Sequence, residues 1–529
     1  MSLQPLPVTF SNFRKLREGN YLYIDKTEQA YKLITGTEKQ YFLARPRRFG
    51  KSLFVSTLNE ILCGNKKLFN DLWIAQSNYS WQERGVIALD FSGFSAEDAS
   101  SLKKGLSQIL MEVANQYKLP IPLDIDRPDA ILRNIVIALH AQYNAVAILI
   151  DEYDSPIVRS LENRRATKSI INTLRNFFST IKSLGNYVDF VFITGVSSFA
   201  KAGVFSGMNN LQVISLDSPF ATTCGYTDHE IDVNLSPYLQ RWAQDKQTDY
   251  DTLRSDLKYW YNGYHFGIHV AAVYNPFSVM RALKEQSFEN YWFESGTPSF
   301  LIEELKKEYR KTEYKMIDPE AFRISKTDLG IFEAGLVPLP ALMFQTGYVT
   351  IVGHDQSKKP YRLGYPNYEV KEAFEEYLVS VLTQLDYSTT SNITAHLANA
   401  FEEKNIEEVV NIIRQLFSHV PYSLQTQKES FYHALLQMAF RAAGIKAKSE
   451  TLTSHARIDM VLDLPQTIFV IECKFNQPAE MALKQIEKRR YYEQFLNEGK
   501  SIVLLGLSFE RSKNHFDIKY AVKALPIKI

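Results

Sequence analysis

The chain has 529 residues and a formal net charge of +1, with 45% hydrophobic and 22% charged residues. This length exceeds what one hydrophobic core can organise, so two or three domains are expected, and the balanced composition excludes a disordered or collagen-like chain. The near-neutral charge by itself predicts no polyanionic partner.

The sequence also bears on the cellular compartment. The longest apolar runs, AVAILI at 145 and IVLLGL at 502, are far shorter than the roughly 20 residues of a membrane helix, so no membrane partner is expected. The first residues lack the pattern of a signal peptide. Cys63, Cys224 and Cys473 are widely spaced, which favours reduced thiols over a disulfide framework. We therefore expect a cytoplasmic protein.

A candidate phosphate-binding loop follows the first predicted strand. QYFLAR (40–45) is apolar enough for a strand, and KSLFVSTLNEILCG (51–64) has helical spacing and a closing glycine. The intervening RPRRFGKS (45–52) completes the second half of G-x-x-x-x-G-K-[ST] but has arginine at the first glycine. Lys51 is expected to contact the β and γ phosphates of ATP, and Ser52 to bind Mg²⁺. The predicted nucleotide-binding residues of the loop are Arg47, Arg48, Phe49, Gly50, Lys51 and Ser52. Taken alone, these letters also fit a helix start with a basic surface.

An acidic pair ends a later strand. AVAILIDEYD (145–154) has the pattern of a Walker B strand, in which a buried run ends in two adjacent acids. Asp151 is expected to hold Mg²⁺ together with Ser52, and Glu152 to polarise the attacking water. The alternative is that the two acids only cap the segment that follows.

The N-terminal part, residues 1–221, predicts an α/β fold. VDFVFITGVSS (188–198) forms a third strand that contains Thr194 near its end. With GVIALDFSG (85–93) and LQVISL (211–216), about five strands alternate with helices. Such alternation is typical of a mainly parallel sheet that helices cover on both faces.

The middle of the chain, residues 222–420, is rich in tyrosine and tryptophan and is predicted to be helical. The cluster YWYNGYHF (259–266) could stack on bases, but clustered aromatic residues in a helical region favour a core. MFQTGYVTIVG followed by YRLGYPN predicts a strand pair, and a winged-helix-like unit is expected near 340–370. We expect this region to contain the ATPase lid and a coupling module.

Residues 421–529 contain a second set of candidate catalytic residues. ARIDMVLD (456–463) alternates along a strand, and TIFVIECK (467–474) follows a short turn. A turn centred between Leu464 and Pro465 places Asp459 opposite Val470, with Glu472 one diagonal step away and Lys474 on the same face. The thiol of Cys473 is expected on the opposite face. Two carboxylates and a lysine in this arrangement suit metal-assisted hydrolysis of a phosphodiester, although chance matches to this spacing are common.

Several motifs together give a more specific indication. LPVTFSNFRKLREGNYLYIDKT, RPRRFGKSL, LIDEYDSP, FSGMNNL, YNGYHF and YNPFSV occur in this order along the chain. This series resembles the bacterial AAA-ATPase-like family, whose members often end in a PD-(D/E)XK nuclease domain. In that family the arginine-rich loop without the first glycine is the usual form, so the resemblance favours nucleotide binding.

The resemblance implies a role for further residues and a fold for the C-terminal part. It implies an AAA-like P-loop sheet, a helical middle region and a restriction-endonuclease-like α/β domain. In AAA-type ATPases a polar residue at the position of Thr194 senses the γ-phosphate. The implied catalytic residues of the nuclease are Asp459, Glu472, Lys474 and Gln485, and Asp459 and Glu472 would bind Mg²⁺, or alternatively Mn²⁺. Glu450 is a candidate additional acid, and Ala456 stands where relatives usually have glycine.

Two functions remain open from the sequence. The first is an ATPase whose nucleotide state controls a metal-dependent nuclease, with DNA favoured over RNA because residues 421–529 hold 16 lysines and arginines against 11 acids. The second is a nucleotide-switched regulatory or binding protein whose nuclease-like domain does not cut. A homo-oligomer is an inference from the ATPase class.

Overall fold

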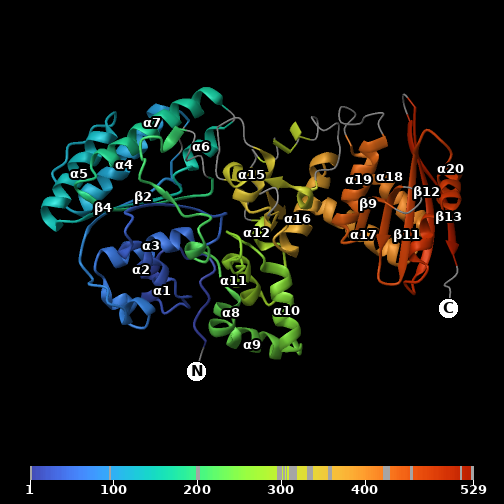
Figure 1. Ribbon diagram of the computed structural model, residues 1–529, viewed down its shortest axis with the longest axis horizontal. Coiled ribbons are helices and arrows are strands. Elements are labelled where there is room, and N and C mark those ends of the chain that lie inside the picture. Colours follow the sequence, from blue (N-terminus) through green and yellow to red (C-terminus); the bar gives the residue numbers. More distant parts are fainter. Residues whose placement is uncertain are drawn as a thin grey trace. The chain divides into compact units, whose positions relative to one another are not determined.

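The computed structural model describes residues 3–94, 97–161, 163–197, 203–294, 301, 304–305, 307–308, 318–329, 338–355, 360–420, 429–452, 457–512 and 515–525. The chain forms two compact units. The first comprises Met1–Leu301 and Pro319–Glu369, and the second comprises Ile302–Asp318 and Val370–Ile529. Each unit contains a five-stranded β-sheet (Figure 1).

The five-stranded sheet of the first unit has the order β2-β3-β4-β1-β5, and all of its strand pairs are parallel. Its strands are β1 (Gln40–Ala44), β2 (Gly85–Asp90), β3 (Val146–Asp151), β4 (Val188–Gly195) and β5 (Gln212–Val213). Every residue of β3 is buried, as expected for an apolar strand that is covered on both faces. Because β4 lies between β1 and β3, the carboxyl ends of these three strands are adjacent.

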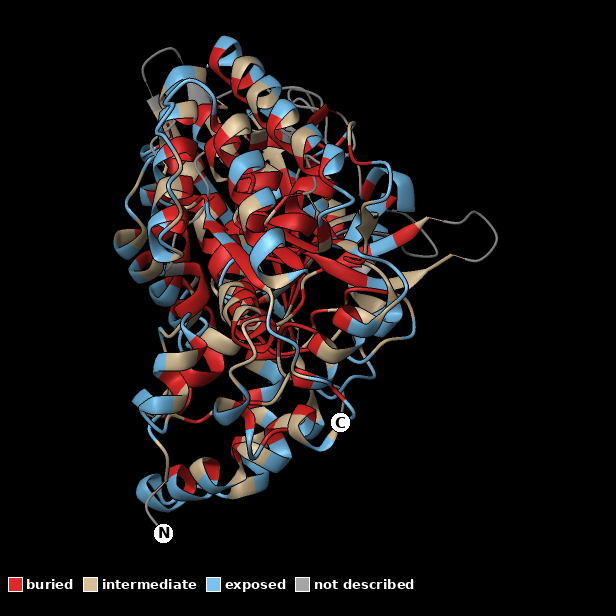
Figure 2. Ribbon diagram, turned by 90° about the vertical axis from the view of Figure 1, so that its left-hand side faces the viewer, coloured by how far each residue is buried: buried red, intermediate tan, exposed pale blue. Residues whose placement is uncertain are grey.

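Helices cover both faces of this sheet. The helices are α1 (Phe13–Glu18), α2 (Thr27–Thr35), α3 (Lys51–Leu62), α4 (Ala99–Gln116), α5 (Pro128–Tyr143), α6 (Ser155–Ser160) and α7 (Arg164–Ser183). Helices α1, α2 and α3 pack together on one face, while α4, α5 and α7 pack together on the other (Figure 1). In Figure 2 the helices are buried on one side and exposed on the other, and the central strands are buried. This layering places the carboxyl edge of the sheet next to the start of α3.

A helical region follows the sheet within the same unit. Its helices are α8 (Asp228–Asn234), α9 (Ser236–Lys246), α10 (Tyr250–Tyr261), α11 (Pro276–Glu285) and α12 (Tyr291–Glu294). They share one hydrophobic core, which also includes Leu22 and Ile24 from the N-terminal segment. Within the cluster YWYNGYHF (259–266), Tyr261, Tyr264 and Phe266 are buried, whereas Tyr259 is 61% exposed. Most aromatic side chains of this cluster are therefore buried, in agreement with its interpretation as core.

A small sheet completes the first unit. It has the order β6-β8-β7, formed by Arg323–Ile324, Tyr361–Gly364 and Thr350–His354. Helices α14 (Lys326–Leu329) and α15 (Leu339–Thr346) accompany it. The predicted strand pair is therefore present as β7 and β8, although the first part of MFQTGYVTIVG belongs to α15 rather than to a strand. Gly347 ends α15 with a φ of 94°, a left-handed conformation that glycine adopts easily.

The second unit is built on a mixed sheet with the order β13-β12-β11-β10-β9. Its strands are β9 (Lys446–Leu452), β10 (Arg457–Asp463), β11 (Thr467–Phe475), β12 (Ser501–Ser512) and β13 (His515–Leu525). Strands β11 and β12 are parallel, and the other neighbours are antiparallel. Its helices are α16 (Tyr368–Thr383), whose first two residues belong to the first unit, α17 (Tyr387–Glu402), α18 (Ile406–Ser418), α19 (Glu429–Ala442) and α20 (Ala479–Arg489).

The two faces of this second sheet are covered by different helices. Helix α20 packs on β11, β12 and β13, and its Ile486 joins a core with Val461 and Val470. Helices α18 and α19 pack on strands from the other side (Figure 1). Phe401 of α17 meets Phe469 of β11 edge to face. Strand β11 is thus covered on both faces, which explains its unbroken apolar run. The expected α/β fold, with a parallel N-terminal sheet, a helical middle and a C-terminal α/β domain, is confirmed.

Candidate functional site

The loop between β1 and α3 has the backbone of an anion site. Helix α3 begins at Lys51 after Gly50, whose φ of 90° is left-handed, and no side chain caps the helix. Arg48 also has a positive φ, of 65°. The first N–H groups of a helix have no partner within the helix, and together with the helix dipole they favour an anion. Residues 47–54 line a cavity of about 520 Å³, a volume within the range of small-molecule sites.

Arg45, which replaces the first glycine of the motif, has a structural position. Its side chain is 1% exposed. The guanidinium Nη1 donates to the carbonyls of Ala44 and Ser215 at 2.8 Å each, and Nη2 donates to that of Phe220 at 3.0 Å. The group also lies 4.0 Å from the centre of the Phe266 ring. Burial lowers the pKa of Arg45 to about 10. Arg45 therefore fastens the loop to the segment that follows β5.

The remaining loop residues differ in their exposure. Arg47 and Arg48 are exposed and line the cavity, and the Arg48 guanidinium lies 4.9 Å from the centre of the Phe277 ring. Phe49 is buried, with its ring edge-on to Tyr264. Lys51 is buried, and its Nζ donates to the carbonyls of Arg45 and Pro46 at 3.0 Å each. Positive charge from three side chains is thus gathered at the start of α3.

Ser52 and the acidic end of β3 carry the oxygen atoms of the expected Mg²⁺ site. Ser52 is partly buried and lines the cavity, as does Glu152. Asp151 is buried, and its Oδ1 accepts hydrogen bonds from the hydroxyl of Thr194 and from the N–H of Glu152. Hydroxyl and carboxylate oxygens are the ligands that Mg²⁺ prefers, so these residues fit the expected ion. When bound, Mg²⁺ would neutralise phosphate charge at this edge of the sheet.

Glu152 has an unusual backbone and a shifted pKa. Its φ is 49°, an uncommon conformation for a residue that is not glycine. Burial raises the pKa of the Glu152 carboxyl above its ordinary range, Lys51 opposes this shift, and the neighbouring carboxylates of Asp151 and Asp154 reinforce it. A carboxylate with a raised pKa is a better proton acceptor near neutral pH than an ordinary one.

Asp154 lies at the same carboxyl edge of the parallel sheet and was not predicted from the sequence. Its side chain is 2% exposed, and Oδ2 accepts hydrogen bonds from the N–H groups of Val196 and Ser197 at 3.1 and 2.7 Å. Burial raises the pKa of Asp154. Asp154 ties the segment after β3 to the end of β4. Its presence in LIDEYDSP, three residues after the strand, was the signal that could have identified it.

The lining of the cavity combines charged and apolar side chains. The phosphate loop and Glu152 supply the charged groups. Val8 and Phe10 of the N-terminal segment and Phe277 and Met280 of α11 supply apolar surface. Polar groups that suit phosphate and apolar surface that can cover a ring are the properties that a nucleotide site needs.

In the second unit, the strand pairing corrects the predicted hairpin register. Val461, rather than Asp459, lies opposite Val470, and Met460 lies opposite Ile471. The predicted pairing was wrong by two residues because the centre of the turn lies one residue later, between Pro465 and Gln466, where the N–H of Leu464 bonds to the carbonyl of Thr467. Continuing this register would place Asp459 opposite Glu472, but the pairing ends at Met460. The two carboxylates then enter separate groups, because Asp459 accepts the N–H of Cys473 whereas Glu472 contacts Lys474 and Gln485. The predicted position of Asp459 and Glu472 on one face is therefore not reflected in their contacts.

Glu472, Lys474 and Gln485 form a connected group. Glu472 is 1% exposed, and its Oε1 lies 3.0 Å from Lys474 Nζ and accepts a hydrogen bond from Gln485 Nε2. Gln485 comes from α20, and the other two come from β11. Neighbouring polar groups of this kind fix the orientation of a ligating carboxylate.

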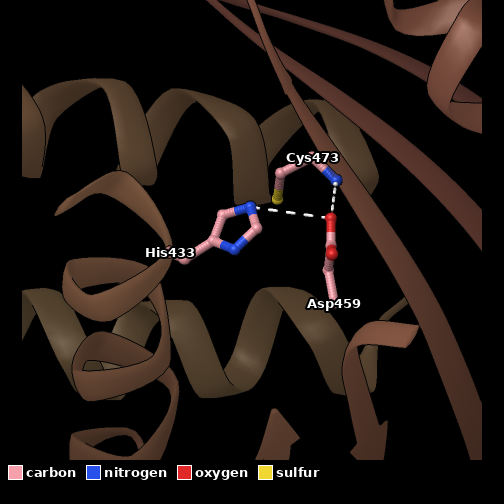
Figure 3. A group of neighbouring side chains, drawn as sticks. All are labelled: His433, Asp459 and Cys473. Carbon is pink, nitrogen blue, oxygen red and sulfur yellow. Dashed lines mark hydrogen bonds and ion pairs between the residues drawn. The ribbon is translucent and has the colours of Figure 1, made fainter. Parts of the chain in front are cut away.

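Asp459 lies in a different group. Its Oδ2 accepts a hydrogen bond from the N–H of Cys473 at 3.0 Å and lies 3.6 Å from Nε2 of His433 in α19. The thiol of Cys473 points toward the same place (Figure 3). The expectation that this thiol would face away from Asp459 is therefore wrong. The pairing of β10 with β11 stops at Met460, and the Asp459 carboxylate takes the next N–H of β11, which brings it toward the thiol.

His433 is a residue that sequence analysis did not select. Its only signal was its place in ESFYHALLQMAFRAAG, the helix that precedes the acidic strands. The side chain of Glu450, the candidate additional acid, and the position of Ala456 lie outside the described residues. Each of the two groups contains a carboxylate, Asp459 in one and Glu472 in the other, of the kind that suits a divalent cation, and such an ion would supply charge neutralisation for a scissile phosphate.

Comparison with known proteins identifies the family. Residues 7–205 match the family described as predicted AAA-ATPase, and residues 427–517 match the PD-(D/E)XK nuclease superfamily. The uncharacterized protein in the vnfD 5' region of Azotobacter chroococcum mcd 1 is 34% identical over 527 residues, which cover 97% of each chain. The chain belongs to the AAA-ATPase-like family. The resemblance noted in the sequence is thereby confirmed.

The matches also relate the geometry to the two domains. Lys51, Asp151 and Glu152 fall within the AAA-ATPase-like match, and Asp459, Glu472, Lys474 and Gln485 fall within the PD-(D/E)XK match. The architecture is thus that of an ATPase-like domain combined with a nuclease-like domain. Within the described part of the chain, none of the helices has the length and apolarity that a membrane span requires.

Proposed function

We propose that the AAA-ATPase-like domain binds and hydrolyses ATP with Mg²⁺, and that its nucleotide state controls metal-dependent cleavage of DNA by the PD-(D/E)XK domain. The observation that carries the proposal is that two sets of reactive side chains occur in one chain. Lys51 and Glu152 line one cavity, and Glu472, Lys474 and Gln485 are in direct contact.

The roles at the nucleotide site follow from position. Lys51 and the first N–H groups of α3 bind phosphate, and Arg47 and Arg48 add positive charge at the cavity wall. Ser52 and Asp151 hold Mg²⁺. Glu152 accepts the proton of the attacking water, a role that its raised pKa supports. Thr194, which donates to Asp151, holds this carboxylate in place and transmits the state of the γ-phosphate.

The roles at the nuclease site follow in the same way. Asp459 and Glu472 bind a divalent ion, Lys474 positions the attacking water, and Gln485 orients Glu472. A nucleic-acid substrate is supported by α20, where Lys484 and Lys488 are exposed on either side of Gln485 in the sequence. Exposed lysines beside a metal site suit phosphate contacts. The protein would work in the cytoplasm, and assembly into a homo-oligomer remains a prediction.

Two assays with matched variants test the proposal. ATP hydrolysis is expected in the wild type and in Lys67→Ala, an exposed lysine, but not in Lys51→Ala. Nicking of supercoiled DNA with Mg²⁺ or Mn²⁺ is expected in the wild type and in Asp463→Asn, which lies on the same strand and pairs with Lys500, but not in Asp459→Ala. DNA binding without cleavage under all metal conditions would instead identify a nucleotide-switched binding protein.

A further inference from the structure

Three side chains from separate elements converge beside the proposed nuclease centre. His433 comes from α19, Asp459 from β10 and Cys473 from β11, and the three are directed toward one another (Figure 3). One imidazole nitrogen, one carboxylate oxygen and the thiol sulfur all lie within 4.8 Å of one another. This group has not been assigned a role by the motif of two carboxylates and a lysine, which includes only Asp459.

The separation between His433 and Asp459 is that of two ligands of one ion. Nε2 and Oδ2 are 3.6 Å apart, beyond the roughly 3.2 Å limit of a direct N–H···O hydrogen bond. Zinc-type ions hold nitrogen and oxygen ligands at about 2.0–2.2 Å and sulfur at about 2.3 Å, so that two ligands of a tetrahedral ion lie about 3.3–3.8 Å apart. The observed spacing therefore suits an ion between the two side chains.

Burial and orientation also suit a metal site with an open position. Cys473 is fully buried, whereas the side chains of His433 and Asp459 are 24% and 22% exposed. An ion bound here would contact protein on the inner side and remain accessible from outside. The hydrogen bond from the Cys473 N–H to Oδ2 holds the Asp459 carboxylate in this orientation, as outer contacts of metal ligands commonly do.

The kind of ion follows from the donor atoms. Mg²⁺ and Ca²⁺ prefer oxygen ligands, whereas imidazole and thiolate favour Zn²⁺, Co²⁺ and related transition metals. We propose that His433, Asp459 and Cys473 bind one such transition-metal ion. The use of this ion in cleavage rests on the proposed nuclease function, but its binding does not.

Cobalt titration of the full chain, without nucleotide or DNA, tests the site directly. A bound Co²⁺ that contacts a thiolate gives a near-ultraviolet charge-transfer band, which oxygen and nitrogen ligands alone do not give. The wild type is expected to develop this band to one equivalent. Cys473→Ser is expected to lose the band, and His433→Ala to weaken cobalt binding about 10-fold or more. Cys63→Ser and His396→Ala, an exposed histidine of α17, are expected to behave as the wild type.

Several results would overturn the inference. These are absence of the band in the wild type, its persistence in Cys473→Ser, or cobalt affinity that His433→Ala leaves unchanged. Because Cys473→Ser changes a buried core position, X-ray absorption on the cobalt-loaded wild type provides a test without a variant. A sulfur shell at about 2.3 Å supports the site, and a shell of oxygen and nitrogen alone refutes it. Cobalt binding together with absent cleavage would refute the nuclease while leaving this site intact.

Discussion

The hydroxyl of Thr194 donates a hydrogen bond to the carboxylate of Asp151, where strands β4 and β3 end next to each other. Both side chains are buried, at 0% and 6% exposure. Asp151 also accepts the N–H of Glu152, so two hydrogen bonds hold one carboxylate oxygen in position. The expected metal ligand is therefore oriented by the strand that separates it from the phosphate loop.

The first prediction concerns this contact. Thr194→Val keeps the shape of the side chain but removes the hydroxyl that orients Asp151. We expect Mg²⁺-dependent ATP turnover to fall about 10-fold or more, with a higher Mg²⁺ requirement. Turnover measured against Mg²⁺ concentration checks this. Thr180→Val, at a partly exposed position of α7, serves as the control, and an unchanged Mg²⁺ requirement in Thr194→Val would count against the assigned role.

The second prediction concerns the replaced glycine of the motif. Arg45→Gly restores the first glycine of the phosphate-loop motif but removes a buried guanidinium that donates to three carbonyls at 2.8–3.0 Å. We expect the free energy of unfolding of the first unit to fall by about 2–4 kcal/mol, without a gain in ATP affinity. Thermal unfolding and nucleotide titration check this. Arg45→Lys retains the charge without the planar fork, so its stability should lie in between. Tighter nucleotide binding by Arg45→Gly would show that the arginine is a defect of the loop.

These two positions show what the sequence could predict in the first unit. A parallel sheet was predicted from the apolar run of β3 and from the alternation of strands and helices. An anion site at its edge was predicted from the glycine before Lys51. The contacts of the Arg45 side chain were not predictable, because the guanidinium donates to backbone carbonyls of residues 215 and 220. Asp154 likewise contacts only N–H groups of a later segment. Backbone partners of this kind leave no residue pattern in the sequence.

The third prediction uses the raised pKa of Glu152. A general base must be deprotonated, so turnover should rise with pH as this carboxyl ionises. Because burial raises its pKa, the acid limb of the pH–rate profile should lie above the ordinary glutamate pKa of about 4.3. Glu152→Gln should bind ATP but lose about 100-fold or more in turnover. Measurement of kcat against pH checks the first point, and full activity of Glu152→Gln would contradict the assignment of the base.

The fourth prediction concerns the helical region. Asp228 at the start of α8 pairs with Arg254 and Lys258 of α10 at 2.8 Å each and accepts the Tyr274 hydroxyl at 2.7 Å. Burial alone would raise the pKa of Asp228, but hydrogen bonds from Lys258, Tyr274 and Arg254 lower it to about 2. The folded pKa is below the unfolded value of about 3.9. The stabilisation is therefore complete above about pH 5 and is lost as the pH falls toward 2.

Asp228→Asn should accordingly lower the thermal unfolding temperature near pH 7, and its difference from the wild type should shrink as the pH approaches 2. The carboxylate is 40% exposed, so solvent screening limits the loss to about 1 kcal/mol. Unfolding curves at several pH values measure this difference. Asp126→Asn, at an exposed loop position, is the control. A difference that grows on acidification would have the wrong sign.

The fifth prediction concerns the orientation of Glu472. Gln485→Ala removes the amide that donates to Glu472 Oε1, so DNA cleavage should fall about 10–100-fold and require more divalent metal. Plasmid nicking at increasing metal concentration measures both effects. Gln466→Ala, in the exposed turn between β10 and β11, should cleave normally. A loss of cleavage that added metal does not relieve would indicate a role other than orienting a metal ligand.

The nuclease-like domain shows a different limit of sequence analysis. Alternation along β11 predicted that Glu472 and Lys474 share a face, and the family resemblance implied Gln485, which contacts Glu472. Asp459, predicted on the same face, instead contacts Cys473. The hairpin register depends on which residues form the turn, and the sequence LPQ does not determine whether the turn is centred before or after Pro465. The contact between Asp459 and His433 depends on how α19 packs against the sheet. The only trace of this long-range packing in the sequence is a histidine within an otherwise ordinary amphipathic helix.

Control of cleavage by nucleotide is the central claim, and the DNA cleavage rate of the full chain, with and without ATP, tests it most directly. We expect ATP to change the rate at least several-fold in the wild type and in Lys67→Ala, and to leave the rate of Lys51→Ala unchanged. Asp459→Ala should not cleave under either condition while it still hydrolyses ATP. Cleavage at the same rate with and without ATP, by a wild-type chain that hydrolyses ATP, would contradict the account.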